Sequence, residues 1–269
     1  MCDNVRVAGK TALVLSAGGM FGAYQAGAWE VLAPVFRPDL VVGASVGAVN
    51  GWQIACGCQA AELVRRWLNL DALARLRWRL RWNPLAGGVV DAGPLERMLR
   101  DVAAEGPPRM PYAAVVTELA RLRPCLIDGA QVDWRHLAAS CAVLGLLPQP
   151  LIDGRRYTDG GLMGALPLWA AVELGATRIV AVHVLPRMSW PIRAAVAALR
   201  GLSRHRPRTP SGVEVLLIAP AGPLGTLRDA SVWSRENARR WIEQGRRDAA
   251  ETASWRDTPW RDTPWRGIA

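Results

Sequence analysis

The chain has 269 residues, of which 51% are hydrophobic and 21% are charged. This composition is typical of a folded globular protein and excludes a disordered one. The net charge of +10 favours an anionic partner, either a nucleic acid or a phospholipid surface.

The sequence also bears on the cellular compartment. No apolar stretch approaches the roughly 20 residues of a transmembrane helix. The first apolar run is too short and too rich in glycine for a signal peptide, and it fits a first core strand better. We therefore expect a cytoplasmic protein, with at most peripheral contact with a membrane.

The N-terminal part of the chain alternates predicted strands with predicted helices. In chain order these are a buried strand at 11–16, a helix at 23–32, a second buried strand at 39–43 and a helix that extends to about residue 56. A short turn separates each strand from the helix that follows it. This alternation predicts parallel strands covered by helices, and hence an α/β fold.

The rest of the domain continues the pattern and adds a hairpin. The stretch "DAGPLERMLRDVA" begins a helix, with Pro94 at its first position. Asp153-Gly154 is a strong hairpin-turn signal. The remaining predicted elements are strands at 113–119, 123–128, 177–185 and 213–220 and a closing helix at 231–250.

The last residues differ in kind from the rest. Residues 253–269 repeat Trp-Arg-Asp-Thr-Pro with a period of five, and proline at that interval forbids a continuous helix. We therefore predict one domain over residues 1–252, followed by an exposed tail at 253–269. The tryptophans of this tail either contact a membrane or a partner, or belong to a short duplicated tail without chemistry.

The cysteines predict neither disulfides nor a metal site. Their number is odd, and they lie mostly among apolar residues. No C-x-x-C pair or nearby histidine has the spacing of a zinc site. We therefore expect buried free thiols at Cys2, Cys56, Cys58, Cys125 and Cys141.

The first chemically informative motif is Gly43-Ala44-Ser45-Val46-Gly47, between a predicted strand and a predicted helix. In a G-x-S-x-G turn of this kind, the serine sits on a sharp, strained turn with its hydroxyl exposed. The pattern also occurs by chance. From these residues alone, Ser45 is either a nucleophile or a serine in a loop of small residues.

A second motif, Gly18-Gly19-Met20-Phe21-Gly22, directly follows the first predicted strand. The backbone N–H groups of such a loop can turn toward one point beside a helix N-terminus, which suits a phosphate or the oxyanion of acyl transfer. A dinucleotide-binding fingerprint is the alternative. Ala17 stands where that fingerprint has its first glycine, which weakens the alternative.

The third motif is Asp159-Gly160-Gly161, and it matters because a serine nucleophile needs a base within hydrogen-bonding reach. Three histidines could supply a conventional triad. His136 lies in a predicted helix, His183 in a strand-like run, and His205 in a loop rich in arginine and proline. Each position fits a structural or exposed role better, so a histidine triad is the poorer interpretation.

These three motifs, in this order and spacing, resemble the patatin-like phospholipase family over nearly the whole domain. The resemblance rests on "LVLSAGGMFGAYQAG", "GASVG" and "LAASCAVLGLLPQPLIDGRRYTDGG". It implies a single α/β domain whose central, mostly parallel sheet is flanked by helices. It also implies that the nucleophile lies on a strand–turn–helix elbow.

The resemblance further implies a Ser–Asp dyad that works without histidine, metal or organic cofactor. Ser45 would attack an acyl ester, Asp159 would take its proton, and the backbone N–H groups of Gly18 and Gly19 would hold the oxyanion. The other glycines of the family motifs are Gly22, Gly43, Gly47, Gly160 and Gly161. The implied activity is lipid acyl-ester hydrolysis of the phospholipase A or lysophospholipase type.

The chain departs from the family pattern in two places. Ala17 and Phe21 replace a glycine and a basic residue of the usual G-G-G-x-[RK]-G loop. After Asp159-Gly160-Gly161, "LMGALP" replaces the usual polar residues and puts substrate contacts in doubt, though not the dyad. Alternative functions are an esterase or acyltransferase on neutral lipid with the same dyad, or a non-catalytic membrane-binding relative.

One further segment bears on partners. Residues 75–82, "RLRWRLRW", alternate arginine with leucine or tryptophan. In an extended conformation the guanidinium groups would lie on one side, which suits an anionic phospholipid surface, although a segment packed on the domain would have the same pattern. No nucleic-acid module is recognised. The expected partners are a lipid ester substrate and an anionic membrane surface, and no nucleic acid.

Overall fold

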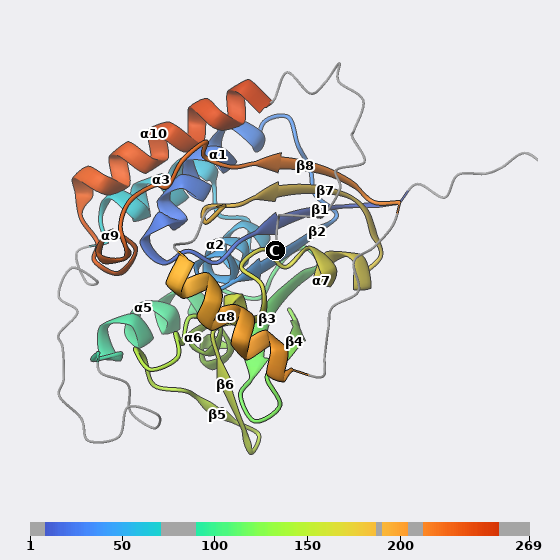
Figure 1. Ribbon diagram of the computed structural model, residues 1–269. Helices are drawn as coiled ribbons and strands as arrows, with labels where there is room; N and C mark the ends of the chain where they lie inside the picture. The colour runs from blue at the N-terminus through green and yellow to red at the C-terminus, as the bar shows by residue number, and fades with distance from the viewer. Residues whose placement is uncertain (1–8, 71–89, 187–189, 204–211, 253–269) are drawn as a thin grey trace, which may run out of the picture.

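The structure is a computed structural model that describes residues 9–70, 90–186, 190–203 and 212–252. The arginine- and tryptophan-rich segment at 75–82, the repeat tail at 253–269, Cys2 and His205 lie outside the described residues. Figure 1 shows a central sheet with helices on both of its sides. The predicted α/β fold is confirmed.

The middle of the sheet is parallel, as the alternation of strands and helices predicts. Its parallel strands are, in spatial order, β3 (Tyr112–Glu118), β2 (Leu40–Ala44), β1 (Lys10–Leu15), β7 (Ala176–Val182) and β8 (Glu214–Ile218). Leu13 of β1 lies opposite Val41 of β2 and Val180 of β7. The residues of β2 and β3 are buried throughout, as is usual for parallel strands covered on both faces.

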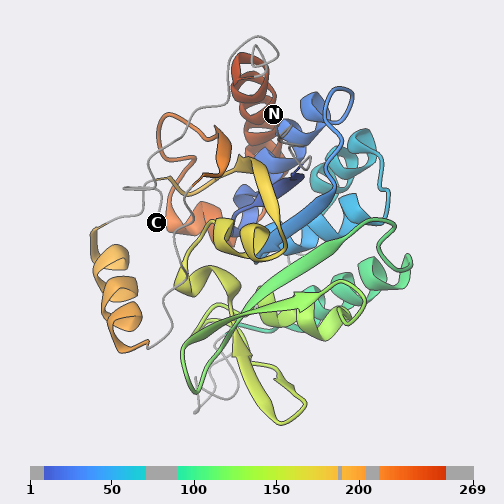
Figure 2. The same cartoon turned by 90° about the vertical axis from the view of Figure 1, so that its right-hand side faces the viewer.

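Antiparallel strands extend the sheet at the β3 edge. Both β4 (Arg123–Asp128) and β6 (Arg155–Thr158) pair antiparallel with β3, and β5 (Leu151–Ile152) pairs with β6. The β5–β6 turn is formed by Asp153 and Gly154 with φ of 47° and 75°, which confirms the predicted hairpin. In Figure 2 this hairpin projects from the lower end of the molecule.

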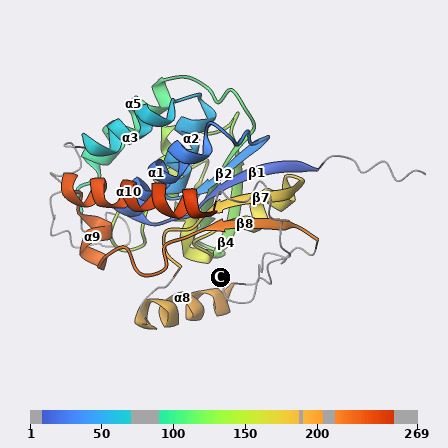
Figure 3. The same ribbon diagram turned by 90° about the horizontal axis from the view of Figure 1, so that it is seen from above.

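Two hydrophobic layers cover the two faces of the sheet. Leu13 and Leu15 face a layer that includes residues of α1 (Gly22–Leu32), α2 (Val46–Ala55), α3 (Ala60–Leu68), α5 (Gly93–Ala104) and α10 (Arg235–Thr252). Ala12 and Val14, which alternate with them, pack with α7 (Leu168–Glu173) on the other face. Figure 3 shows α8 (Trp190–Leu202) on the side of the sheet opposite α10.

Short elements complete the described fold. These elements are η1 (Gly19–Phe21), α6 (Trp134–Ser140), η3 (Gly160–Met163) and α9 (Leu227–Ser231), and α9 corrects the sequence prediction at the C-terminal end. The predicted closing helix at 231–250 is wrong at its start, because α9 ends at Ser231 and Val232 is extended. The final helix begins only at Arg235. It extends to Thr252, and its last buried residue is Ala249.

Helix α10 packs closely against α1 through small residues. A Cβ on Gly245 would lie 2.1 Å from the Tyr24 carbonyl oxygen, and one on Gly27 would lie 2.0 Å from that of Ile242. Trp241 of α10 contacts Phe21 edge to face, with 4.9 Å between ring centroids. The close approach of the two helices therefore supports the glycine loop, to which Phe21 belongs.

Gly245→Ala is expected to destabilise the protein by about 1–3 kcal/mol, because the added methyl group overpacks the contact between α1 and α10. The matched control is Gly201→Ala in α8, where nothing lies within 4 Å of an added Cβ. The control should stabilise the fold by up to about 1 kcal/mol through helix propensity. Urea denaturation of both variants measures the difference, and equal effects would contradict the close approach.

Candidate active site

Ser45 lies on a sharp turn between β2 and α2, as the sequence predicts for a nucleophile elbow. Its backbone has φ 54° and ψ −126°, a conformation that residues other than glycine rarely adopt. The Ser45 N–H donates to the Ser140 hydroxyl at 2.8 Å, and that hydroxyl donates to the Val115 carbonyl at 2.7 Å. Helix α6 and strand β3 therefore hold the elbow in its strained conformation.

The glycines that flank Ser45 allow this turn to pack against β1. A Cβ on Gly47 would lie 2.3 Å from the Leu15 carbonyl oxygen. One on Gly43 would lie 2.1 Å from the carbonyl oxygen of Gly47 itself. Any side chain at either position would push the start of α2 away from the sheet. The G-x-S-x-G spacing thus has a steric cause in this structure.

The glycine loop follows β1 beside the elbow. Gly19 has φ 56°, and a Cβ there would lie 2.2 Å from the Ala230 carbonyl oxygen, so the position requires glycine. In the described part of the chain, no acceptor is paired with the N–H of Gly18 or of Gly19. Gly22 begins α1, where a Cβ would meet side-chain atoms of Val46 and Trp67. Gly19 and Ser45 line the same cavity.

Asp159 follows β6 and is buried beside Ser45. Its Oδ1 accepts a hydrogen bond from the Gly161 N–H at 2.7 Å, and its carboxyl group also interacts with the Ser45 side chain. The backbone around it is fixed as well, since its N–H donates to the Ala142 carbonyl and its carbonyl accepts from Thr117 Oγ1, each at 3.0 Å. The structure therefore brings Ser45 and Asp159 together.

The glycines after Asp159 connect the three motifs. A Cβ on Gly161 would lie 2.4 Å from the Cβ of Ala17, in the glycine loop. A Cβ on Gly160 would lie 2.0 Å from the Val115 carbonyl oxygen and 3.4 Å from the Cβ of Ala44, next to the elbow. Segments that are far apart in the sequence thus meet around one point.

Burial changes the acidity of Asp159. Desolvation raises the pKa of its carboxyl group to about 6, against the opposing effect of the hydrogen bonds from Ser45 and Gly161. The group is therefore ionised at neutral pH but is a stronger base than an exposed aspartate. A carboxylate of this kind is suited to accept a proton from a hydroxyl.

A cavity of about 820 Å³ opens beside Ser45. Its volume is in the range of sites that bind small molecules. Most of its wall is apolar, formed by residues from α2, α3, α5 and the segments that follow α6 and α9, among them Val46, Val49, Leu63, Trp67, Leu95, Met98, Val102, Leu146, Leu147 and Val232. An apolar chain attached to the reacting carbonyl would be accommodated in this cavity.

Two residues of the site were missed in the sequence. Ser140 holds the Ser45 backbone, and Cys141 lines the cavity and interacts with the Ser45 side chain. Burial raises the pKa of the Cys141 thiol far above its ordinary value, so the thiol stays neutral. Both lie in the quoted stretch "LAASCAVLG", but a serine and a cysteine at a helix end carry no spacing signal.

Among the described residues, the other cysteines and the two histidines, His136 and His183, lie outside the Ser45–Asp159 contact. Cys56, Cys58, Cys125 and Cys141 are free, as predicted, but these residues are partly exposed, which corrects the prediction of buried thiols. His183 is buried just beyond β7, and burial lowers the pKa of its imidazole to about 4. His136 instead completes the capping box of α6 with Asp133.

Within residues 9–70, 90–186, 190–203 and 212–252, no three or more His, Cys, Asp or Glu side chains gather in a group that could hold a metal ion. No helix formed by those residues has the length and apolar character needed to cross a membrane.

Comparison with known proteins identifies the family of this chain. The family model of the patatin-like phospholipases matches residues 13–172, more than half of the chain, and this range contains the glycine loop, the elbow and the Asp-Gly-Gly motif. The chain therefore belongs to the patatin-like phospholipase family. The resemblance stated from the sequence is confirmed.

The relatives of this chain are distant in sequence. Patatin-like phospholipase domain-containing protein 7 of Rattus norvegicus is 28% identical over 184 residues, which cover 64% of this chain and 13% of the rat protein. An uncharacterized NTE family protein of Mycobacterium bovis is 27% identical over 191 residues, 69% of this chain and 52% of that protein. The chain thus matches only part of the length of either relative.

A solved structure supports the fold assignment. VipD of Legionella pneumophila is similar to this chain with a TM-score of 0.50 at 12% identity, over 91% of this chain and 67% of VipD. At this level of identity the similarity concerns the fold alone.

The strain at Ser45 can be measured. Ser45→Gly should be more stable than Ser45→Ala by about 1 kcal/mol, because glycine relieves a strain of about 1–3 kcal/mol and loses part of that gain through its greater entropy in the unfolded chain. Denaturant titration of the two variants gives the difference directly. An alanine variant as stable as the glycine variant would show that the turn is not strained.

Proposed function

We propose that this protein is a serine acyl-ester hydrolase of lipids, of the phospholipase A or lysophospholipase type, with Ser45 and Asp159 as its catalytic dyad. The observation that carries the proposal is the position of the Ser45 side chain, on its sharp turn and beside the buried carboxyl group of Asp159, whose pKa is raised by burial. A serine hydroxyl needs such a base to become a nucleophile. The apolar cavity beside Ser45 supports a lipid substrate.

In the proposed mechanism, Ser45 Oγ attacks the carbonyl carbon of the ester while its proton passes to the Asp159 carboxylate. The negative charge that develops on the carbonyl oxygen is stabilised by the N–H groups of Gly18 and Gly19. The positive end of α2, which begins directly after Ser45 and has no side-chain cap, adds to this stabilisation.

The second half of the mechanism regenerates the serine. The tetrahedral intermediate expels the alcohol, which receives the proton from Asp159. Water then attacks the acyl group on Ser45 and gives a proton to Asp159. Cleavage of the Ser45 ester returns that proton to Oγ and releases the fatty acid. Each step uses Asp159 alone as the proton carrier, which a raised pKa favours.

The proposal includes the location of the protein. With a net charge of +10, it would act as a cytoplasmic enzyme that associates peripherally with anionic membrane surfaces. We place the hydrolase domain at residues 1–252 and treat 253–269 as a tail. The packing of α10 against α1 supports a domain that extends beyond the family match to residue 252.

Ser45→Ala and Asp159→Asn should each lower kcat for hydrolysis of a soluble ester by about three orders of magnitude or more, since loss of a nucleophile or its base removes the reaction path. The matched control is Asp153→Asn, which changes an aspartate in the β5–β6 turn and should leave the rate unchanged. Rates with p-nitrophenyl butyrate and circular dichroism of each variant provide the test. Normal turnover by Asp159→Asn, together with a loss in His183→Ala, would contradict the dyad.

The pKa of Asp159 predicts the acid limb of the pH profile. The carboxyl group must be ionised to accept the serine proton, so kcat/KM should be constant well above pH 6 and fall about tenfold per pH unit below it. The measurement is kcat/KM against pH, with circular dichroism to show that the fold persists. An inflection near 4 instead would fit the lowered pKa of His183 and would speak against Asp159 as the base.

A further inference from the structure

The cavity beside Ser45 extends along one face of α2. Ser45, Val49 and Gln53 are spaced four residues apart, so they lie in one row on the helix, and all three line the cavity. Eight residues at the helical rise place Gln53 about 12 Å from Ser45 along the helix axis. Gln53 is therefore the residue of this row that lies farthest from the nucleophile.

Helices α3 and α5 form the two sides of this groove. On α3, Trp67 Nε1 donates to Asn50 at 3.0 Å near the middle of α2, whereas Arg66 reaches Gln53 near its C-terminal end. On the other side, the Cys56 thiol donates to the carbonyl of Gly106 at 3.3 Å, just past the end of α5. The C-terminal ends of α2 and α5 therefore lie together.

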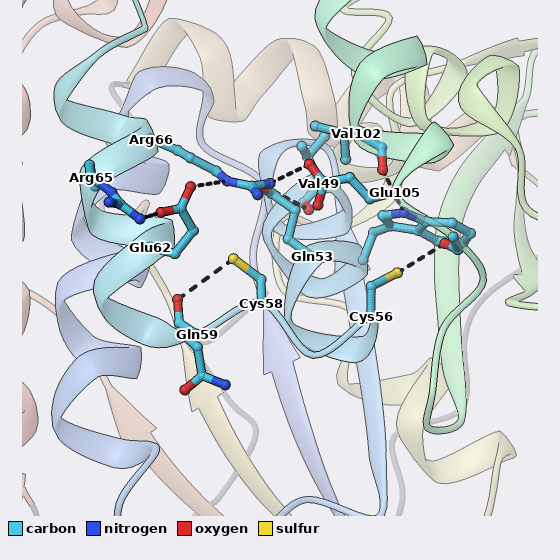
Figure 4. Close-up of polar contacts among 12 residues, drawn as sticks. Val49, Gln53, Cys56, Cys58, Gln59, Glu62, Arg65, Arg66, Val102 and Glu105 are labelled. Atoms are coloured by element: carbon cyan, nitrogen blue, oxygen red, sulfur yellow. Dashed lines mark hydrogen bonds and ion pairs between the residues drawn. The ribbon is translucent and has the colours of Figure 1, made fainter.

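The middle of the groove is apolar and its distant end is charged. Val49, Leu63, Met98 and Val102 line the middle. At the end, Arg66 donates to Gln53 Oε1 at 2.8 Å, to Glu62 Oε1 at 2.9 Å and to Glu105 Oε1 at 2.6 Å. Figure 4 shows Arg66 reaching from α3 toward Gln53 and Glu105. This cluster of Gln53, Glu62, Arg66 and Glu105, here the Arg66 cluster, joins three helices.

The Arg66 cluster is unsuited to bind an anionic headgroup. The guanidinium already contacts two carboxylates, so a phosphate would have to displace one of them. Contact with the Arg66 cluster is equally unfavourable for a hydrocarbon chain. A chain end that reached the cluster would desolvate charged and amide groups without replacing their hydrogen bonds to water.

We propose that this groove binds the acyl chain of the ester that Ser45 attacks, and that the Arg66 cluster limits the length of that chain. The inference rests on the proposed function, and it names the preferred substrate class as esters of medium-chain acids. A chain of a membrane lipid spans half of the hydrocarbon core of about 30 Å, which exceeds the groove length of about 12 Å. An octanoyl chain is shorter and reaches only the apolar part.

The test compares butanoyl, octanoyl and palmitoyl p-nitrophenyl esters below their micellar concentrations. The wild-type protein should prefer the octanoyl ester. Arg66→Met should raise the ratio of palmitoyl to octanoyl kcat/KM about tenfold. The distal methylene groups of the palmitoyl chain would then contact an apolar side chain in place of the charged Arg66 cluster. Gln53→Leu should change the ratio in the same direction. This variant replaces Arg66→Met in the test if Arg66→Met does not fold.

The matched control is Arg178→Met. Arg178 of β7 is also a partly exposed arginine, and the substitution breaks its ion pair with Glu214 of β8. Arg178 does not line the cavity. The ratio should remain that of the wild type. A palmitoyl preference in the wild type, or a ratio unchanged in both cavity variants, would overturn the length limit while leaving the hydrolase proposal intact.

Failure of the proposed function gives a different result. If no ester is hydrolysed, the dyad proposal fails, and the groove is tested by calorimetric titration of octanoic and palmitic acids into Ser45→Ala and into the double variant with Arg66→Met. Tighter binding of octanoic acid, with a relative gain for palmitic acid in the double variant, supports the length limit. Equal ratios in the two proteins contradict it.

Discussion

The candidate site depends on the backbone conformation of one residue. Ser45 has a positive φ that costs a residue other than glycine about 1–3 kcal/mol, and this conformation points its hydroxyl toward Asp159 and the cavity. The cost is met by contacts of the surrounding fold, because Ser140 accepts its N–H and Gly47 allows α2 to approach β1. Substitutions at such supporting positions would disturb the nucleophile without touching it.

Burial of Asp159 imposes a second free-energy cost, and like the strain at Ser45 this cost serves the proposed reaction. Since each pKa unit corresponds to about 1.4 kcal/mol, a rise from the ordinary 3.8 to about 6 makes ionisation in the folded state cost about 3 kcal/mol. The unfolded carboxyl group ionises near pH 4 and the folded one near pH 6, so this cost grows between these values and is complete above them. At neutral pH the ionised Asp159 therefore destabilises the folded protein, and it is a stronger base than an exposed aspartate.

Much of the fold could be predicted because the buried strands are continuous apolar runs with glycine-rich turns after them. β1, β2, α1 and α2 lie within a residue or two of the predicted ranges. Helix α3 was missed, although Ala60, Leu63, Val64 and Trp67 have the spacing of one helix face. The start of α10 was misplaced because a separate short helix, α9, begins at the capping box of Thr226 and ends at Ser231, before the extended Val232.

The site was less predictable than the fold. Periodicity places Ser45 on a turn, but nothing in the spacing of the chain brings it to Asp159; that expectation came from the family resemblance. Ser140 had no signal at all, because a hydroxyl that accepts one backbone N–H leaves no pattern in a sequence. Likewise, the ion pairs of Arg66 depend on three helices packing together. Contacts between distant segments remain invisible until the packing is known.

Helix α2 connects the chemistry of the site to its specificity. Its N-terminal end presents Ser45 and a positive helix dipole, and its C-terminal end presents Gln53 to the Arg66 cluster. Because the rise of an α-helix is fixed, the distance between nucleophile and charged end cannot change without breaking the helix. Changes in chain-length preference must therefore come from side chains on the three helices that line the groove. The elbow, which is held by Ser140 and by the close approach of Gly47 to β1, can remain the same while those side chains vary.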